Sequence, residues 1–229
     1  MNMYKDANEL MDNEMPRSIR IQLFPFFLSG IEAYRQIVEG NSGFFNSVFA
    51  ANIRGPLLNY LIFRQFETDM TTKNFPFKTE SRNVNNFYYK SLSLLKGDVI
   101  VNVGKAYSTD GLPNRAIYRK KYCRLNLFRE KNQLFDISEH NDLVIRKEPY
   151  CMFLTYGIRN GAIDFVNLIV PNTKMTGYLA KKDLKAECLY VAPKQVYSED
   201  VEKRVSALKE DVQKQLDSFK NINDEGEES

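Results

Sequence analysis

The chain has 229 residues, of which 43% are apolar and 13% aromatic, and this is enough to build a sizeable core in one or two domains. The net charge of +3 is unevenly spread: residues 1–16 contribute −3 and residues 221–229 contribute −4, so residues 17–220 carry +10. A basic body with acidic ends favours a polyanionic partner, although acidic ends also serve solubility. The three cysteines lack CxxC spacing, and no apolar run is long enough to cross a bilayer. These features argue against a disulfide framework, a zinc site and a membrane partner, and they favour a cytoplasmic protein.

The first part of the chain is predicted to be helical. Residues 1–16 are expected to form a flexible acidic lead, after which Ser29 and Glu32 have the spacing of a capping box and Gly40 is placed to end a helix. Residues 45–66 keep helical spacing of apolar side chains, and Gly55 and Pro56 are expected to divide this run into two helices.

From Phe75 onward the pattern changes to strands, which are rich in aromatic and β-branched residues. Hairpin turns are predicted at Lys96-Gly97-Asp98 and at Asn160-Gly161. The predicted strands are NNFYYKSLSLL, DVIVNV, RAIYRKKYCRLNLF, DLVIRK, PYCMFLTYG, AIDFVNLIVP and AECLYVA.

The element order predicts an α+β fold, in which N-terminal helices pack on an antiparallel, curled β-sheet that forms a half-barrel or a sandwich. We expect a single domain over residues 17–197, with helices to about 70 and the sheet from about 75. A C-terminal amphipathic helix over residues 198–220 and a disordered acidic tail over residues 221–229 complete the predicted organisation.

The C-terminal helix carries an apolar seam with nearly heptad spacing. Packing against the chain's own domain is the favoured interpretation, and a protein partner or a homodimer is the alternative. The seam consists of Val201, Val205, Leu208, Val212, Leu216 and Phe219.

Several catalytic classes lack support. His140 is the sole histidine, which excludes mechanisms that need two imidazoles, and the chain has no GxSxG, HExxH, P-loop or GxGxxG motif. We therefore predict no catalytic residue, no metal ligand and no cofactor. Cys123, Cys151 and Cys188 fall in predicted strands, where free cysteine is usually a small buried residue.

A metal-dependent nuclease or toxin is retained as an alternative, because such an enzyme needs only carboxylates and a lysine. Its candidate residues lack a specific spacing. They are Glu80, Asp98, Asp136 and Asp164, with Lys78 or Lys105 beside them.

The most site-like feature is the basic stretch from Arg115 to Lys131. In an extended strand neither of its faces is cleanly apolar, which predicts a bulge or a change of burial. Lysine and arginine would contact phosphate and exposed tyrosines would stack on bases, as in many complexes with RNA or single-stranded DNA. The predicted nucleic-acid-binding residues are Arg115, Tyr118, Arg119, Lys120, Lys121, Tyr122 and Arg124.

The order LPNRAIYRKKYCRLNLF, NQLFD, FLTYG and LIVPN, within residues 75–184, resembles a pattern in uncharacterised bacterial and phage proteins of similar size. In these a helical N-terminal part precedes a β-rich half, and the genes often lie near helix-turn-helix regulators. The resemblance implies a phage-conflict, bacterial-defence or toxin–antitoxin setting, and no activity.

The sequence therefore favours a non-enzymatic cytosolic protein whose basic, aromatic sheet surface contacts nucleic acid or a nucleic-acid-associated partner. The alternatives are the metal-dependent nuclease or toxin, and a protein interaction module or inhibitor.

Overall fold

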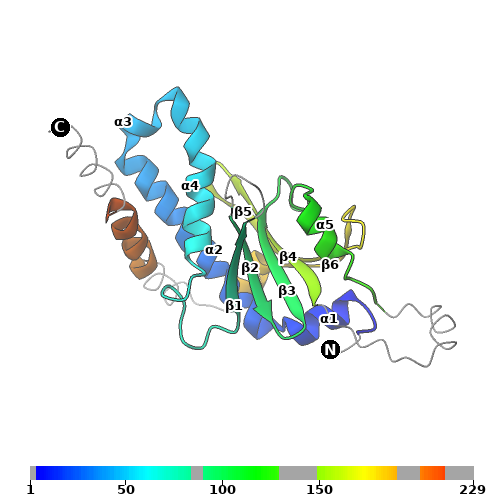
Figure 1. Cartoon of the computed structure of the whole chain (residues 1–229). Coiled ribbons are helices and arrows are strands. Elements are labelled where there is room, and N and C mark those ends of the chain that lie inside the picture. The colour runs from blue at the N-terminus through cyan, green and yellow to red at the C-terminus, as the bar shows by residue number, and fades with distance from the viewer. Residues whose placement is uncertain (1–3, 84–89, 129–148, 190–201, 215–229) are drawn as a thin grey trace, which may run out of the picture. The chain divides into compact units, whose positions relative to one another are not determined.

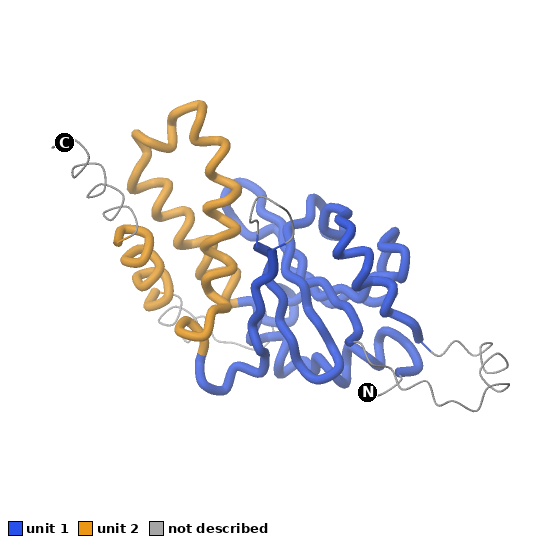
Figure 2. Tube along the Cα trace, in the orientation of Figure 1, with its two compact units in different colours: residues 1–24, 72–191 blue, residues 25–71, 192–229 orange. Residues whose placement is uncertain are grey.

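The computed structural model describes residues 4–83, 90–128, 149–189 and 202–214. The chain divides into two compact units (Figure 2). The single domain expected over residues 17–197 stays a prediction. Unit 1 comprises Met1–Phe24 and Thr72–Val191, and unit 2 comprises Pro25–Thr71 and Ala192–Ser229.

Unit 1 is built on one six-stranded sheet whose strands lie in chain order (Figure 1). All neighbours are antiparallel except β3 and β4, which are parallel, and this confirms the α+β class with a mostly antiparallel sheet. Parallel neighbours need a long crossover, and residues 106–149 provide it. The strands are β1 (Lys78–Asn83), β2 (Lys90–Lys96), β3 (Val99–Lys105), β4 (Tyr150–Arg159), β5 (Ala162–Pro171) and β6 (Tyr178–Asp183).

Both predicted hairpin turns are confirmed. Gly97 has a φ of 51° between β2 and β3, while Asn160 and Gly161 have φ values of 52° and 75° between β4 and β5. Glycine and asparagine are the residues that tolerate this left-handed region, and two successive positive φ values suit a tight two-residue hairpin.

Some strand predictions are wrong. The stretch RAIYRKKYCRLNLF contains helix α5 (Ile117–Cys123), and AECLYVA overlaps helix α6 (Leu184–Leu189). Strands β1 and β6 are not predicted, because each is short and rich in charged residues. The predicted strand DLVIRK lies outside the described residues.

The two faces of the sheet differ in chemistry. One face is apolar, and Tyr4 and helix α1 (Ala7–Glu14) pack on it; the Tyr4 and Tyr150 rings have centroids 5.5 Å apart. The other face carries small polar side chains in the middle of the sheet, and the segment that includes α5 covers part of it. These buried polar residues are Ser91, Ser93, Asn102, Thr155 and Asn167.

Helix α1 lies where a flexible acidic lead is predicted. The carboxylate of Asp6 accepts hydrogen bonds from the amides of Asn8 and Glu9, both at 2.9 Å, which caps the helix. Leu10 and Met11 have no exposed surface, so the lead forms part of the core of unit 1.

Helix α2 (Arg17–Gly40) ends at Gly40 as predicted, but it begins well before Ser29. Pro25 lies inside it and cannot donate to the carbonyl of Ile21, and that carbonyl instead accepts from Cys188 Sγ at 3.9 Å. Ser29 is therefore not an N-cap, and its hydroxyl donates to the Pro25 carbonyl at 2.9 Å.

Unit 2 continues with α3 (Ser42–Phe45), the 3₁₀ helix η1 (Val48–Ala50) and α4 (Ala51–Arg64). Helix α4 runs through Gly55 and Pro56, so the predicted break there is wrong and the chain turns at residues 46–47 instead. No helix in the described ranges is long and apolar enough to cross a membrane.

The C-terminal helix, described over residues 202–214, packs within unit 2. Val205 and Leu208 are buried in one cluster with Ala33, Ile37 and Leu61, and Val212 packs against it. This confirms the favoured interpretation of the seam for these positions. Val201, Leu216 and Phe219 lie outside the described residues.

Gly157 allows the Phe165 ring to lie directly on β4, because an added Cβ would lie 2.2 Å from that ring. Gly157→Ala should therefore lower the free energy of unfolding by about 1–3 kcal/mol through overpacking, measured by urea denaturation.

The matched control is Gly55→Ala in α4, where an added Cβ has no neighbour within 4 Å. This change should leave stability unaltered or raise it by up to about 1 kcal/mol. Equal effects at the two positions would contradict the packing assigned to Gly157.

Candidate nucleic-acid interface

The exposed and buried side chains of α5 follow the spacing of a helix and not the alternation of a strand. Ile117, Lys120, Lys121 and Arg124 follow helical spacing on one face; all are exposed, and Ile117 is 90% exposed. Cys123 is fully buried, and Tyr118, Arg119 and Tyr122 are half-buried. Helical periodicity thus resolves the mixed faces of the predicted strand, with Lys120, Lys121 and Arg124 exposed and the Cys123 thiol buried.

The segment around α5 is basic and contains no acid. Residues 111–128 include five cations and no Asp or Glu, and none of the five forms an ion pair with any described residue. By contrast, Arg64 of unit 2 pairs with three carboxylates. Unneutralised cations on one face favour a polyanionic ligand. The five cations are Arg115, Arg119, Lys120, Lys121 and Arg124.

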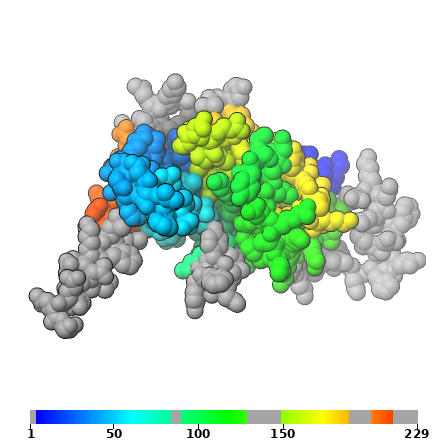
Figure 3. All heavy atoms as spheres, turned by 90° about the horizontal axis from the view of Figure 1, so that it is seen from above, coloured from blue at the N-terminus to red at the C-terminus, as the bar shows by residue number. Residues whose placement is uncertain are grey.

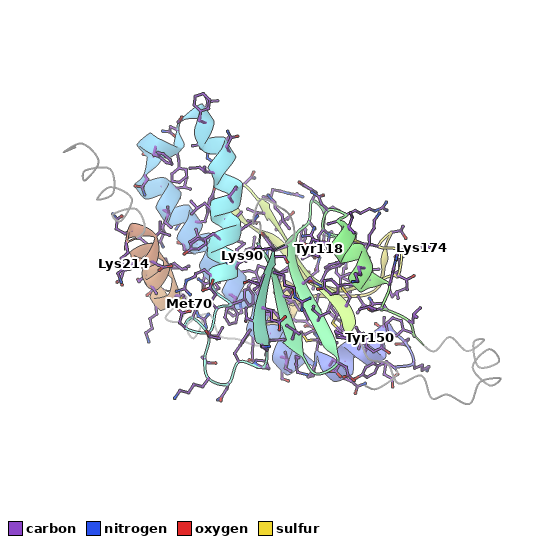
Figure 4. All side chains as sticks on the ribbon, in the orientation of Figure 1. Met70, Lys90, Tyr118, Tyr150, Lys174 and Lys214 are labelled. Atoms are coloured by element: carbon purple, nitrogen blue, oxygen red, sulfur yellow. The ribbon has the colours of Figure 1, made fainter. Side chains whose placement is uncertain are left out.

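The two predicted stacking residues have different environments. Tyr122 is half-buried and packs against the cluster that contains Cys123; its hydroxyl accepts from Arg82, whose guanidinium carbon lies 5.8 Å from the ring centroid. Tyr122 therefore serves mainly to hold α5 in place. Tyr118 is also half-buried, and the guanidinium of Arg119 lies 5.2 Å from its ring centroid (Figure 4).

One further cation lies beside α5 and was not predicted. Met175 is buried in the same cluster as Cys123, with Tyr122 packed against it, and the preceding residue, Lys174, is exposed (Figure 4). Lys174 forms no ion pair within the part of the chain that the structure describes. Lys174 comes close to α5 only through the fold of the turn between β5 and β6. Its spacing in the sequence therefore does not predict that it belongs to this surface.

Asn126 attaches the end of the α5 segment to the sheet. Its side-chain amide donates to the carbonyls of Cys151 and Pro171, both at 2.8 Å, and its oxygen accepts from the Cys151 amide at 2.8 Å. Asn126 thus joins α5 to both β4 and β5, and it is almost fully buried. Further polar bonds on this face of the sheet run from Ser93 to Asn102 at 2.9 Å and from Asn102 to Cys151 Sγ at 3.6 Å.

Cys123 and Cys151 form a buried pair of thiols between α5 and β4. Burial raises the pKa of the Cys151 thiol, and a hydrogen bond from that thiol lowers the pKa of Cys123. A reactive cysteine needs exposure as well as thiolate character, and neither residue has exposed surface. Both are therefore structural residues in this state.

The described carboxylates of the nuclease alternative do not belong to a group that could hold a metal ion. Arg82 and Lys78 hydrogen-bond to Glu80 and lower its pKa, and Asp164 pairs with Arg159 at 3.1 Å. Within the described ranges no group of three or more His, Cys, Asp or Glu side chains could hold a metal ion. Asp98 lies in the turn between β2 and β3, while Asp136 and His140 fall outside those ranges.

The surface of the segment is open to solvent. Figure 3 shows the green region, which includes α5, on the face turned toward the viewer. The basic residues of this surface are Arg115, Arg119, Lys120, Lys121, Arg124 and Lys174, and we call them the α5 basic surface.

Comparison of the chain with protein-family models, curated proteins and solved structures gives no match. The resemblance to uncharacterised bacterial and phage proteins therefore stays a prediction.

Removing the Asn126 amide should strongly destabilise unit 1. Asn126→Ala removes three hydrogen bonds and leaves buried backbone groups of β4 and β5 unsatisfied. We expect it to lower the free energy of unfolding by about 2–4 kcal/mol, measured by urea denaturation. Asn126→Asp should cost at least as much, because it removes the donors and buries a charge. The control is Asn52→Ala, at an exposed position of α4. If Asn126→Ala lowers the free energy of unfolding no more than this control does, the role of Asn126 is contradicted.

The three thiols should be protected in the folded chain, because Cys123, Cys151 and Cys188 are all buried. Ellman's reagent at pH 8 should react at least about 100-fold more slowly with the native chain than with the chain in denaturant. Rapid modification of Cys123 or Cys151 under native conditions would show that α5 does not cover that thiol.

Proposed function

We propose that the chain is a non-enzymatic cytosolic protein that binds RNA or single-stranded DNA through the α5 basic surface. The observation that carries this proposal is the row of Lys120, Lys121 and Arg124 on the outer face of α5, exposed and without carboxylate partners in the described part of the chain. The cytosolic setting is supported by three buried free cysteines.

The helix presents its cations in a fixed arrangement. Seven residues at about 1.5 Å each make α5 roughly 10 Å long, so its outer row can contact about two or three phosphates. Arg115 precedes the helix and Lys174 lies beside it, which extends the surface beyond one helix face. Each phosphate contact releases condensed counterions, and binding should therefore weaken steeply as salt is raised.

Tyr118 and Arg119 supply a further contact next to the phosphate row. The guanidinium of Arg119 donates to the Asn114 carbonyl at 2.7 Å and lies near the Tyr118 ring. An aromatic ring and a guanidinium plane at the edge of a basic surface can stack on an unpaired base, whereas paired bases in a duplex are closed to them. This favours single strands over duplexes.

The alternative of a metal-dependent nuclease receives no such support, because its described candidate acids are dispersed or paired with cations. The phage-conflict or defence setting implied by the resemblance stays a prediction, as does a nucleic-acid-associated protein as partner.

Fluorescence anisotropy with a labelled single-stranded RNA, a single-stranded DNA and a duplex tests the proposal. Lys120→Ala/Lys121→Ala should weaken single-strand binding at least about tenfold at low salt and make the slope of log K against log salt shallower by about 1.4, the counterion contribution of two phosphates.

The matched control is Lys5→Ala/Lys73→Ala, which removes the same charge at two exposed lysines outside the α5 segment. It should leave the affinity within about twofold. Absence of binding at low salt, or equal loss in both double variants, would reject the α5 basic surface as the binding site.

A further inference from the structure

Two of the three thiols lie together between α5 and β4. Cys123 is the last residue of α5, Cys151 is the second residue of β4, and both belong to one buried cluster. The Cys151 thiol hydrogen-bonds to the Cys123 thiol, so the two sulfur atoms are direct neighbours. A disulfide forms only between cysteines that the fold has brought together, because its geometry is tightly restricted. The pair meets this requirement.

Asn126 connects the backbones of the two cysteines. Its amide donates to the Cys123 carbonyl at 3.0 Å, and its side chain hydrogen-bonds to both the carbonyl and the amide of Cys151 at 2.8 Å. The surrounding side chains include Ile100 and Phe153, which are apolar and buried. Formation of a disulfide removes two S–H donors and adds no polar group, so the apolar cluster can enclose the product.

The two thiols differ in reactivity. The hydrogen bond from Cys151 lowers the pKa of Cys123, and the Arg119 guanidinium acts in the same direction. Burial, by contrast, raises the pKa of the Cys151 thiol. Since the thiolate is the species that attacks an oxidant, Cys123 is the first to react, and Cys151 is the neighbour that attacks the oxidised sulfur.

Access to the pair depends on α5. Neither thiol has exposed surface in the folded chain, and α5 packs against β4. The helix has only seven residues, so tertiary contacts alone keep it formed. Short elements of this kind open locally at a lower free energy than the sheet beneath them. A small oxidant therefore reaches Cys123 through local opening, more slowly than it reaches an exposed thiol.

We propose that Cys123 and Cys151 are an oxidant-responsive dithiol, which hydrogen peroxide converts into an intramolecular disulfide that joins α5 to β4. The Cys123 thiolate attacks one peroxide oxygen and the O–O bond breaks; a sulfenic acid forms, and the released hydroxide takes up the Cys123 proton to give water. Cys151 then attacks the sulfenic sulfur. The S–S bond forms, the S–O bond breaks, and the Cys151 proton leaves with the second water. The two thiols lose two electrons to one peroxide molecule.

Cys188 provides an internal comparison. It lies on α6, it is buried, and its Sγ donates to the Ile21 carbonyl at 3.9 Å, but it is not among the described residues of the cluster that holds the pair. Disulfides in a reducing compartment are typically transient and redox-sensing, which agrees with the proposed cytosolic setting. The inference is independent of nucleic-acid binding, because the disulfide is measured without any ligand.

Oxidation of the full chain with hydrogen peroxide, followed by alkylation in denaturant and peptide mapping, tests the proposal. The native chain should lose two of its three free thiols and yield a Cys123–Cys151 cross-linked peptide, which dithiothreitol reverses. Cys188→Ser should form the same disulfide at the wild-type rate. In Cys151→Ser the sulfenic acid on Cys123 should persist and react with dimedone.

The disulfide should also stabilise the chain, because it restricts the unfolded state. The oxidised chain should unfold at a urea concentration about 1 M higher than the reduced chain. Asn126→Ala, which loses the hydrogen bonds between α5 and the sheet, should regain part of its lost urea midpoint on oxidation. Cys151→Ser is the control and should show no such shift.

Three free thiols after a peroxide dose that oxidises the urea-denatured chain overturn the proposal. A mixture of pairings in the native chain that includes Cys188, or a cross-link between chains in place of the internal one, overturns it too. Oxidation of Cys123 to sulfinic acid without a disulfide would show that Cys151 does not reach the oxidised sulfur, and this result also rejects the pair.

Discussion

The hydrogen bonds of the Asn126 side chain are the interaction on which the α5 basic surface depends. Helix α5 has only seven residues, and a helix of two turns is not stable in water without tertiary contacts. Asn126 joins its end to the backbones of β4 and β5, and Cys123 and Tyr122 fill the space beneath it. These contacts belong to the connection that parallel pairing of β3 and β4 requires. The Asn126 amide therefore attaches the segment that carries the cations to the sheet.

The outer row of α5 combines an unfavourable and a favourable electrostatic contribution to helix stability. Lys120 and Arg124 are four residues apart on one helix face, where like charges destabilise a helix by a few tenths of a kcal/mol. Part of this is offset, since Lys120 and Lys121 lie in the last turn, where cations interact favourably with the helix dipole. No nearby carboxylate relieves the rest within residues 111–128. Exposed cations that have no carboxylate partner in their own segment are typical of a functional surface.

The sequence predicted the features that short-range chemistry determines. Turns at Gly97 and at Asn160-Gly161, and the strands beside them, follow from local preferences for positive φ and for alternation. Helix α5 was missed because its cations are exposed on one face and its tyrosines are half-buried, so its pattern resembles an irregular strand as closely as a helix. Lys174 and the Asn126 bonds depend on residues distant in sequence, and only the folded chain reveals them. The small polar residues of SLSLL and VIVNV occupy positions that point to one side of a strand. This alternation could have predicted the polar face of the sheet.

Hydrogen–deuterium exchange of the full chain, with and without a single-stranded RNA at low salt, tests the central claim most directly. Bound RNA should slow exchange in peptides that cover α5 and the turn at Lys174, and the protection should disappear when the salt is raised. Unchanged exchange over α5 in the presence of bound RNA, with protection confined to other segments, would contradict the account.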